Sequence, residues 1–232
     1  MGRVPARVAE PSPPGRADVG DCGRLWGTMR VFLPSTLPAL ARALRTGQVD
    51  AGQVDAGQVD AGQQGAGRLS TGQVDAGQQG AGRQGAGRIP MPGFAVTPAL
   101  REAYASGDAE ELEYAALTAA ARASLRMLAA DPAAPPRRLV LAAELPAAQV
   151  RPDPLDAEPG RVTVMAPVPL ENLVSAHVDD PDAAADVRRA AAGVRRAAAG
   201  GADAGFDVDR AEGHELAWYA VQELPELAAG AT

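Results

Sequence analysis

Hydrophobic and polar residues alternate with a period of two in several segments of this chain, and this period predicts β-strands. Near the start, Val31 and Leu33 fall on one face of an extended segment and Phe32 falls on the other. The segment 137–145 has a nearly continuous apolar centre, typical of a strand covered on both faces. The segment 215–221 fits a strand or a helix, and its aromatic residues favour a strand. Strand-like patterns of this kind occur at 30–33, 137–145, 161–166, 173–178 and 215–221.

The stretch 94–128 contains the most strongly patterned element of the sequence. A short buried strand and a proline-marked turn are expected first, followed by a helix with Asp108 as its N-cap. Glu111 completes a capping box with Asp108, and further carboxylates in the first turn suit the helix dipole. One apolar stripe then recurs at spacings of four, four and three: Leu117, Ala121, Leu125 and Leu128. Arg122 and Arg126 fall between these positions and are expected to face outward.

Two more helices and two irregular segments complete the predicted order. One helix begins after Ser35 or Thr36 and ends at Gly47 as its C-cap. Another covers 181–199 and contains the unit VRRAAAG twice in succession. A proline-rich loop (146–160) and a short turn or helix (169–171) connect the strands. The order β-α-(insert)-β-α-β-β-α-β predicts an α/β (α+β) fold in which helices pack on a mixed β-sheet.

A tandem repeat of five-residue units, such as AGQVD and AGQQG, extends from Thr46 to Pro90. A solenoid is the structured alternative, because fixed periods can arise from stacked coils. Such a solenoid needs a large apolar residue at the centre of every unit, and several units have glutamine there. Glycine in every unit also raises the entropic cost of order. We therefore expect a disordered insertion, and a third hypothesis gives it a role of its own as a flexible tether or an interaction segment.

These patterns divide the chain into five parts around a single domain. Residues 1–28 are rich in proline, glycine and charge, and we expect a disordered tail or an over-extended start. The domain begins with its first strand and helix in 29–47. The insertion occupies 48–90, and the remainder of the domain occupies 91–226. A disordered C-terminus is expected for 227–232.

Composition restricts the classes of function. The formal net charge is −7, which argues against general affinity for nucleic acid. The 22 basic residues are all arginine, a bias that follows GC-rich codons. Cys22 is the single cysteine, so no intrachain disulfide can form, and this fits the cytoplasm. No signal peptide and no membrane-spanning segment is predicted.

Five segments resemble those of an uncharacterised actinobacterial family, a domain of unknown function. They are MRVFLPSTLPALARALRTG, FAVTPALREAYASGDAEELEYAALTAAARASLRMLAADP, PRRLVLAAELP, PVPLENLVSAHVDD and GHELAWYAVQEL. The similarity extends from Met29 to Glu226 apart from the repeat, where the family has a shorter link. The resemblance implies a small bacterial cytoplasmic protein. It carries over no reaction, ligand or catalytic residue.

The two histidines offer only incomplete metal sites. His177 and Asp179 would share one face of a strand, but a third ligand must come from elsewhere, so these are weak metal candidates. His214 is followed by Glu215, yet no second histidine follows at the spacing of a zinc-protease helix. No metal or cofactor is predicted.

An acidic and aromatic set is the best candidate pocket. Carboxylates beside a histidine can perform acid–base chemistry if they converge. The structural alternative is that they cap a helix, pack, or lie on the surface. The catalytic candidates are Glu111, Glu113, Tyr114, His214 and Glu215, and the ligand-binding candidates are Tyr104, Trp218, Gln222 and Glu223, with Tyr219 nearby.

The absence of a complete catalytic set favours a non-catalytic binding or accessory domain. Its partner would be an unknown protein or small molecule, and neither nucleic acid nor a membrane. The alternative is a small enzyme, such as a hydrolase, with a pocket around Glu111 and His214. Convergence of these side chains in one concave site would distinguish the two hypotheses.

Overall fold

A seven-stranded antiparallel sheet forms the centre of the computed structural model, which describes residues 27–51, 90–105, 107–153, 158–201 and 205–230. The strand order is β5-β6-β3-β1-β4-β8-β9, and β2 and β7 form a separate pair. The strands of the large sheet are β1 (Thr28–Ser35), β3 (Met91–Phe94), β4 (Leu139–Pro146), β5 (Val150–Pro152), β6 (Arg161–Val164), β8 (Leu173–Asp179) and β9 (Leu216–Ala220). The small pair consists of β2 (Gln48–Val49) and β7 (Val168–Pro169). Each pair among the described strands is antiparallel, so no parallel pair of the expected mixed sheet is found there.

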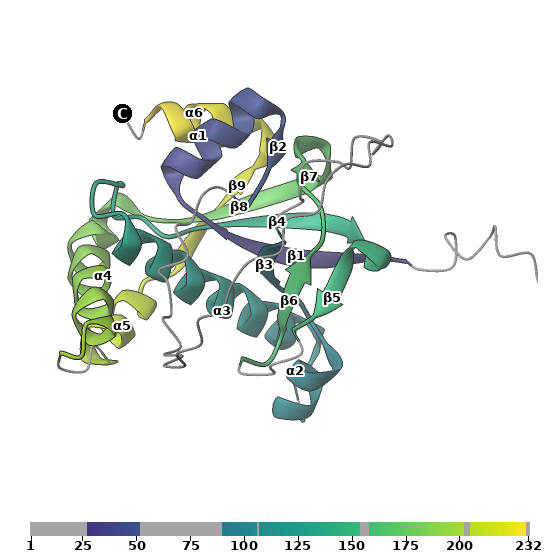
Figure 1. Ribbon diagram of the computed structural model, residues 1–232, viewed down its shortest axis with the longest axis horizontal. Coiled ribbons are helices and arrows are strands. Elements are labelled where there is room, and N and C mark those ends of the chain that lie inside the picture. Colours follow the sequence, from purple (N-terminus) through teal and green to yellow (C-terminus); the bar gives the residue numbers. More distant parts are fainter. Residues whose placement is uncertain (1–26, 52–89, 106, 154–157, 202–204, 231–232) are drawn as a thin grey trace, which may run out of the picture.

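Helices pack on both faces of this sheet, and the predicted α+β fold class is confirmed. Figure 1 shows α1 and α6 on one side of the sheet and α3 on the other, with α4 and α5 beside one end of α3. The helices are α1 (Leu37–Thr46), α2 (Pro98–Ala103), α3 (Ala109–Ala130), α4 (Ala184–Ala198), α5 (Gly205–Glu212) and α6 (Leu224–Ala229). Short 3-10 turns follow β4, β7, β8 and β9.

The central strand β1 divides the hydrophobic core as its alternation predicted. Val31 and Leu33 pack with α1, α6 and the matching residues of β4. Phe32 points to the opposite face, where it packs with α3 and with Phe94 of β3. The same alternation along β4 places Leu141 on the first face and Val140 on the second. Both faces are therefore apolar, which is why these strands read as continuous hydrophobic runs.

The predicted ends of α1 and α3 are confirmed. Thr36 accepts a hydrogen bond from Ala39 N, and Gly47 closes α1 with φ 78°, which glycine adopts without the steric cost that a Cβ adds. Asp108 and Glu111 form the capping box of α3, with Oδ1 of Asp108 2.9 Å from Glu111 N. These caps satisfy backbone N–H groups that the first turn of a helix leaves free.

The apolar stripe of α3 is largely buried, but it packs on two different surfaces. Ala121 packs with the sheet, whereas Leu125 and Leu128 pack with α4 and α5. Leu117 is only partly buried. Arg122 and Arg126 lie on the outer face, where each forms an ion pair at a partly exposed site. Leu117 is the exception because α3 leaves part of β8 and β9 uncovered beside it.

Several elements were missed by the sequence-based prediction. The proline-marked turn after β3 is followed by a helix of its own, α2, because Thr97 caps it and Pro98 occupies its first position. The segment 146–160, predicted as a loop, contains β5, which pairs with β6. Neither α5 nor α6 was expected, and α6 places buried Leu227 inside the segment predicted to be a disordered C-terminus.

The start of the insertion also differs from the prediction. The boundary was placed at residue 48, yet Gln48 and Val49 form β2 and Val49 is buried against the core. The first repeat unit therefore contributes to the folded domain. The predictions for 52–89 and 1–26 lie outside the described residues. Within the described part of the chain, no helix is both long enough and apolar enough to cross a bilayer.

Candidate functional site

A groove of about 370 Å³ lies between α3 and the end of the sheet formed by β8 and β9. Helix α3 covers β1, β3 and β4 but not all of the last two strands, so their side chains on this face line a surface depression. We call it the α3–β9 groove. The residues that matter for its chemistry are Tyr114, Leu117, His177, Glu215, Leu216 and Trp218.

Two aromatic side chains at this groove are unusually exposed. Trp218 of β9 is 60% exposed and Tyr114 of α3 is 65% exposed. Each is a large aromatic side chain with more than half of its surface exposed to water. Both line the same depression, Tyr114 from α3 and Trp218 from β9, so together they form an exposed apolar patch. An aromatic pair of this kind provides apolar contact area together with a polar indole N–H and phenol O–H.

His177 lies at the base of the groove on β8. Its ring contacts Phe32 edge to face, with the ring centroids 6.4 Å apart, and its Nε2 is 3.4 Å from the hydroxyl of Ser175. Burial lowers the pKa of His177, and the nearby positive charge of Arg30 lowers it further. The groove therefore presents a neutral imidazole at neutral pH, which suits packing and hydrogen bonding.

His214 closes one end of the groove, but its ring points away to a cluster of charges. Its Nε2 is 2.9 Å from Oδ2 of Asp186, and the same carboxylate bonds Arg189 and Arg210. The hydrogen bond from His214, together with the bond from Arg189, lowers the pKa of Asp186 to about 2. His214 thus fixes the turn before β9 against α4.

This cluster predicts an acid-dependent stability. Because the pKa of Asp186 is lower in the folded chain than the ordinary value near 3.8, its contribution to stability is present above about pH 4 and is lost as the pH falls towards 2. We expect Asp186→Asn to lower the unfolding midpoint at pH 6 and to leave it nearly unchanged near pH 2. Thermal melts of both proteins across this range measure the difference. An effect of the substitution that is equal at both pH values would contradict the expectation.

Asp179, one of the two candidate metal ligands, is occupied by another partner. Arg138 and Asp179 are both buried, and the guanidinium Nη2 lies 2.7 Å from Oδ1 while Nε lies 2.9 Å from Oδ2. The backbone N–H of Arg138 donates to the same carboxylate at 2.7 Å. His177 and Asp179 do share one face of β8, but the carboxylate has no free position for a metal. No group of three or more potential ligands occurs elsewhere in the described residues.

The remaining sequence candidates do not converge on the groove. Glu111 is held in the capping box of α3, and Glu113 pairs with Arg30 at 3.1 Å. Glu223 accepts a hydrogen bond from Ala220 N at 2.7 Å. Tyr104 ends α2 at a separate place, Tyr219 points to the α1 face of the sheet, and Gln222 lies in the turn after β9. The structure therefore brings together four of the catalytic and ligand-binding candidates at the groove, Tyr114, His214, Glu215 and Trp218, beside the metal candidate His177.

The outer edge of β9 is the second feature of this site. Asp179 N donates to Arg138 O, so the backbone groups of His177 and Asp179 point to β4. In an antiparallel ladder the neighbours alternate along a strand, so Val178 and Ala176 bond β9 through their partners Ala217 and Tyr219. The N–H and C=O groups of Leu216 and Trp218 consequently point outward, where no described strand follows.

Comparison with known proteins adds one finding. The model of a family of unknown function, DUF6912, matches residues 76–228, which is more than half of the chain. The chain belongs to this family. The matched DUF6912 range includes every residue of the groove, while β1 precedes it and still pairs with β3 and β4 at the centre of the sheet. The folded unit therefore begins upstream of the DUF6912 match. No curated protein matches the chain, and no solved structure does.

Sequence reasoning missed three of the six side chains named above for the groove: Leu117, His177 and Leu216. Leu117 was assigned to the core stripe of α3, and His177 was considered only as a metal ligand. The alternation of β8 and β9 gives the face on which His177 and Trp218 lie, but it does not show that the two strands pair. Their direct opposition, His177 to Trp218, depends on a register that only the structure provides.

Proposed function

We propose that this chain is a non-catalytic binding domain that takes an extended segment of a protein partner along β9. The observation that supports it best is the combination of an open strand edge with the α3–β9 groove beside it. Addition of a strand supplies main-chain hydrogen bonds, and pockets for alternate side chains supply specificity. The two features are adjacent here, so one bound segment would use both.

The composition of β9 supports strand addition. Proteins usually protect an edge strand with charge, proline or a bulge, and β9 (LAWYA) contains neither charge nor proline. Its outward groups at Leu216 and Trp218 are available for a ladder with another strand. An edge that carries an exposed tryptophan and lacks such protection is typical of a recognition surface.

The side chains around the edge indicate the chemistry of the partner. Every second residue of the added strand would lie on the α3 side, beside Trp218 and Tyr114, where an aliphatic or aromatic side chain would bury apolar surface. Glu215 is exposed at the start of β9 and forms no ion pair within the described part of the chain. We therefore expect the partner segment to combine an apolar residue with a neighbouring lysine or arginine.

The alternative of a small enzyme built on Glu111 and His214 has less support. Glu111 is absent from the groove and serves the helix cap, and the ring of His214 is directed to Asp186. The hydroxyl of Ser175 is buried beneath the groove, and its contact with His177 is long. General acid–base catalysis needs a base within hydrogen-bond reach of the substrate proton, and neither Glu111 nor His214 is positioned to act as that base in the groove.

We also propose the bacterial cytoplasm as the site of action. The single cysteine and the family resemblance support this localisation.

The repeat joins β2 and β3 of the same domain, so it would act as an interaction segment for the partner, which is an independent proposal. Deleting residues 52–88 tests it, because loss of partner binding without loss of stability would support this role.

The binding proposal predicts a large effect at Trp218. Peptides that bind the full chain would be selected from a random library, and their affinities for variants measured by calorimetry. We expect Trp218→Ser to weaken binding roughly 30-fold, since aromatic hot spots contribute about 2 kcal/mol or more. Phe206→Ser is the matched control: Phe206 is 77% exposed on α5, and we expect its loss to leave affinity unchanged.

Removal of backbone N–H donors from the peptide distinguishes strand addition to β9 from binding that uses only a side chain inserted in the groove. N-methylation of alternate amides of the selected peptide removes donors to β9 without altering its side chains. We expect methylation at one set of alternate positions to abolish binding and at the other set to be tolerated. Equal tolerance at both sets, or selected peptides unaffected by Trp218→Ser, would overturn the proposal. Crosslinks showing that β9 pairs with a second copy of the chain would also overturn it.

A further inference from the structure

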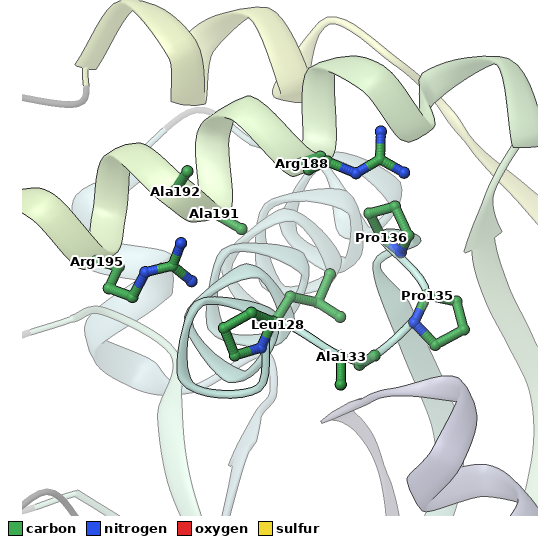
Figure 2. A pocket seen from close by; sticks show the side chains of 10 residues that line it. Leu128, Ala133, Pro135, Pro136, Arg188, Ala191, Ala192 and Arg195 are labelled. Carbon is green, nitrogen blue, oxygen red and sulfur yellow. The ribbon is translucent and has the colours of Figure 1, made fainter.

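A second cavity of about 290 Å³ lies between α4 and the turn that follows α3. We call it the α4 pocket. Its floor is apolar and includes Leu128 and Ala191, and one wall is the proline-rich turn at 132–136. Figure 2 shows Arg188 and Arg195 extending from α4 on either side of its mouth.

The duplicated unit VRRAAAG explains why both arginines are on the same side. Arg188 and Arg195 are equivalent positions of the two copies and are seven residues apart. Seven residues correspond to about two turns of an α-helix and a rise of about 10 Å, so both side chains lie on one face. The tandem duplication has therefore placed two cationic groups on the pocket face of α4, with Ala191 and Ala192 between them on that face.

The charges of these two arginines are not neutralised by the described residues. In each copy the second arginine forms an ion pair: Arg189 with Asp186, and Arg196 with Asp207 at 3.8 Å. The first arginine does not. Arg195 only donates to Ala129 O at 3.4 Å, and no ion pair involves Arg188 in the described part of the chain.

The acidic residue next to the proline-rich turn, Asp131, does not pair with either arginine in the described part of the chain. Asp131 precedes the proline-rich turn, and its Oδ1 accepts a hydrogen bond from Ala133 N at 3.1 Å. Its side chain is not part of the pocket lining. The α4 pocket is thus an apolar depression with a positive charge at each end.

The proline wall makes the pocket a preformed feature. Proline fixes its own φ, and Pro132, Pro135 and Pro136 lie within one short turn. The turn is also tied by two backbone contacts, Ala134 N to Asp131 O at 3.1 Å and Arg137 N to Pro135 O at 2.8 Å. A wall that loses little entropy on binding favours affinity for a ligand of matching shape.

We infer that the α4 pocket binds an elongated organic dianion with an anionic group at each end and an apolar body between them. Each guanidinium would form charge-assisted, bidentate hydrogen bonds with one carboxylate or phosphate group. The apolar body would cover Leu128, Ala191 and the prolines. This inference is independent of the α3–β9 groove, because the two depressions share no lining residue.

The test uses the full chain and a series of straight-chain α,ω-dicarboxylates of increasing length, titrated by calorimetry. We expect an affinity maximum at one chain length, because both ends must reach a guanidinium at once. The monocarboxylate of that length should bind at least tenfold more weakly. The matching α,ω-bisphosphonates show whether carboxylate or phosphate ends are preferred. Absence of saturable binding for both series at millimolar concentration would overturn the inference.

Substitution of the arginines provides the specific control. We expect Arg188→Gln or Arg195→Gln each to weaken binding of the best dicarboxylate by at least tenfold. Arg189→Gln and Arg196→Gln make the same change of charge on the same helix but outside the pocket, and each should change affinity less than threefold. Thermal melts verify that each variant is folded. Equal losses in both sets would mean that the helix attracts anions only through its general charge, and the inference would be wrong.

Discussion

Replacing Asp179 with alanine is expected to lower the free energy of unfolding by about 3–5 kcal/mol, because the substitution leaves the buried guanidinium of Arg138 without its counter-charge. Arg138 and Asp179 are both almost inaccessible to water, and the carboxylate accepts hydrogen bonds from the guanidinium and from Arg138 N. When Asp179 is replaced, water therefore cannot reach the guanidinium of Arg138 to solvate its unpaired charge. A chain of this size can lose most of its stability through such a change.

The measurement is denaturant unfolding of the wild-type chain and of Asp179→Ala. The control is Glu158→Ala, which breaks the exposed ion pair with Arg126 and should cost about 0–1 kcal/mol. A double variant, Arg138→Met with Asp179→Leu, should recover part of the loss because it removes the unpaired charge. If Asp179→Ala costs no more than Glu158→Ala, the buried pair does not have the role assigned to it.

The same ion pair connects stability to the candidate binding site. Arg138 Nη2 also donates to His214 O at 3.0 Å, which holds the turn leading into β9. Hydrogen exchange in the segment 213–220 should therefore increase in Asp179→Ala even under conditions in which the domain stays folded. The groove wall that carries Trp218 is therefore held by a buried charge pair beside the start of β9, and Arg138 of this pair also lines the groove.

The parts of the fold that local pattern determines were predictable. The alternation of Val31, Phe32 and Leu33 correctly assigned both faces of β1, and the capping residues Asp108 and Thr36 correctly located two helix starts. These signals come from residues close together in sequence. They do not depend on which element packs against which.

The elements that were missed depend on tertiary contacts. Both α2 and α6 have six residues, too few to show a helical period, and they are stabilised by the burial of Leu100 and Leu227 against the core. Strand β5 has three residues and forms only because β6 is beside it. Val49 of the repeat was read as part of a disordered insertion, yet β7 and the core give it a place to pack.

The candidate site could be predicted only in part for a similar reason. Tyr114, His214, Glu215 and Trp218 were identified as members of one set from their chemical types, and the structure places all four at the groove. The same criterion also selected Glu111 and Glu113, whose carboxylates serve a helix cap and an ion pair. Residue type alone does not distinguish these roles. The spacing of Arg188 and Arg195 was visible in the duplication, but the wall opposite them comes from the turn after α3.

Ser124→Ala is expected to lower the free energy of unfolding by about 2–4 kcal/mol, although it removes a single oxygen atom. The hydroxyl of Ser124 lies on the buried face of α3, donates to Ser35 O at 2.7 Å and accepts from Leu139 N at 3.0 Å. It therefore joins the helix to the end of β1 and the start of β4. Its loss leaves one buried acceptor and one buried donor unpaired, at about 1–3 kcal/mol each.

Alanine favours a helix over serine by a few tenths of a kcal/mol, so helix propensity alone predicts that this substitution is stabilising. The sign of the measured change thus decides between the two effects. Ser175→Ala is the matched control, because Ser175 is also buried but its hydroxyl makes only the 3.4 Å contact with His177. We expect that variant to lose about 1 kcal/mol or less. Faster hydrogen exchange at Leu139 N in Ser124→Ala would locate the loss at this junction, and a stabilised Ser124→Ala protein would show that the bridge contributes nothing.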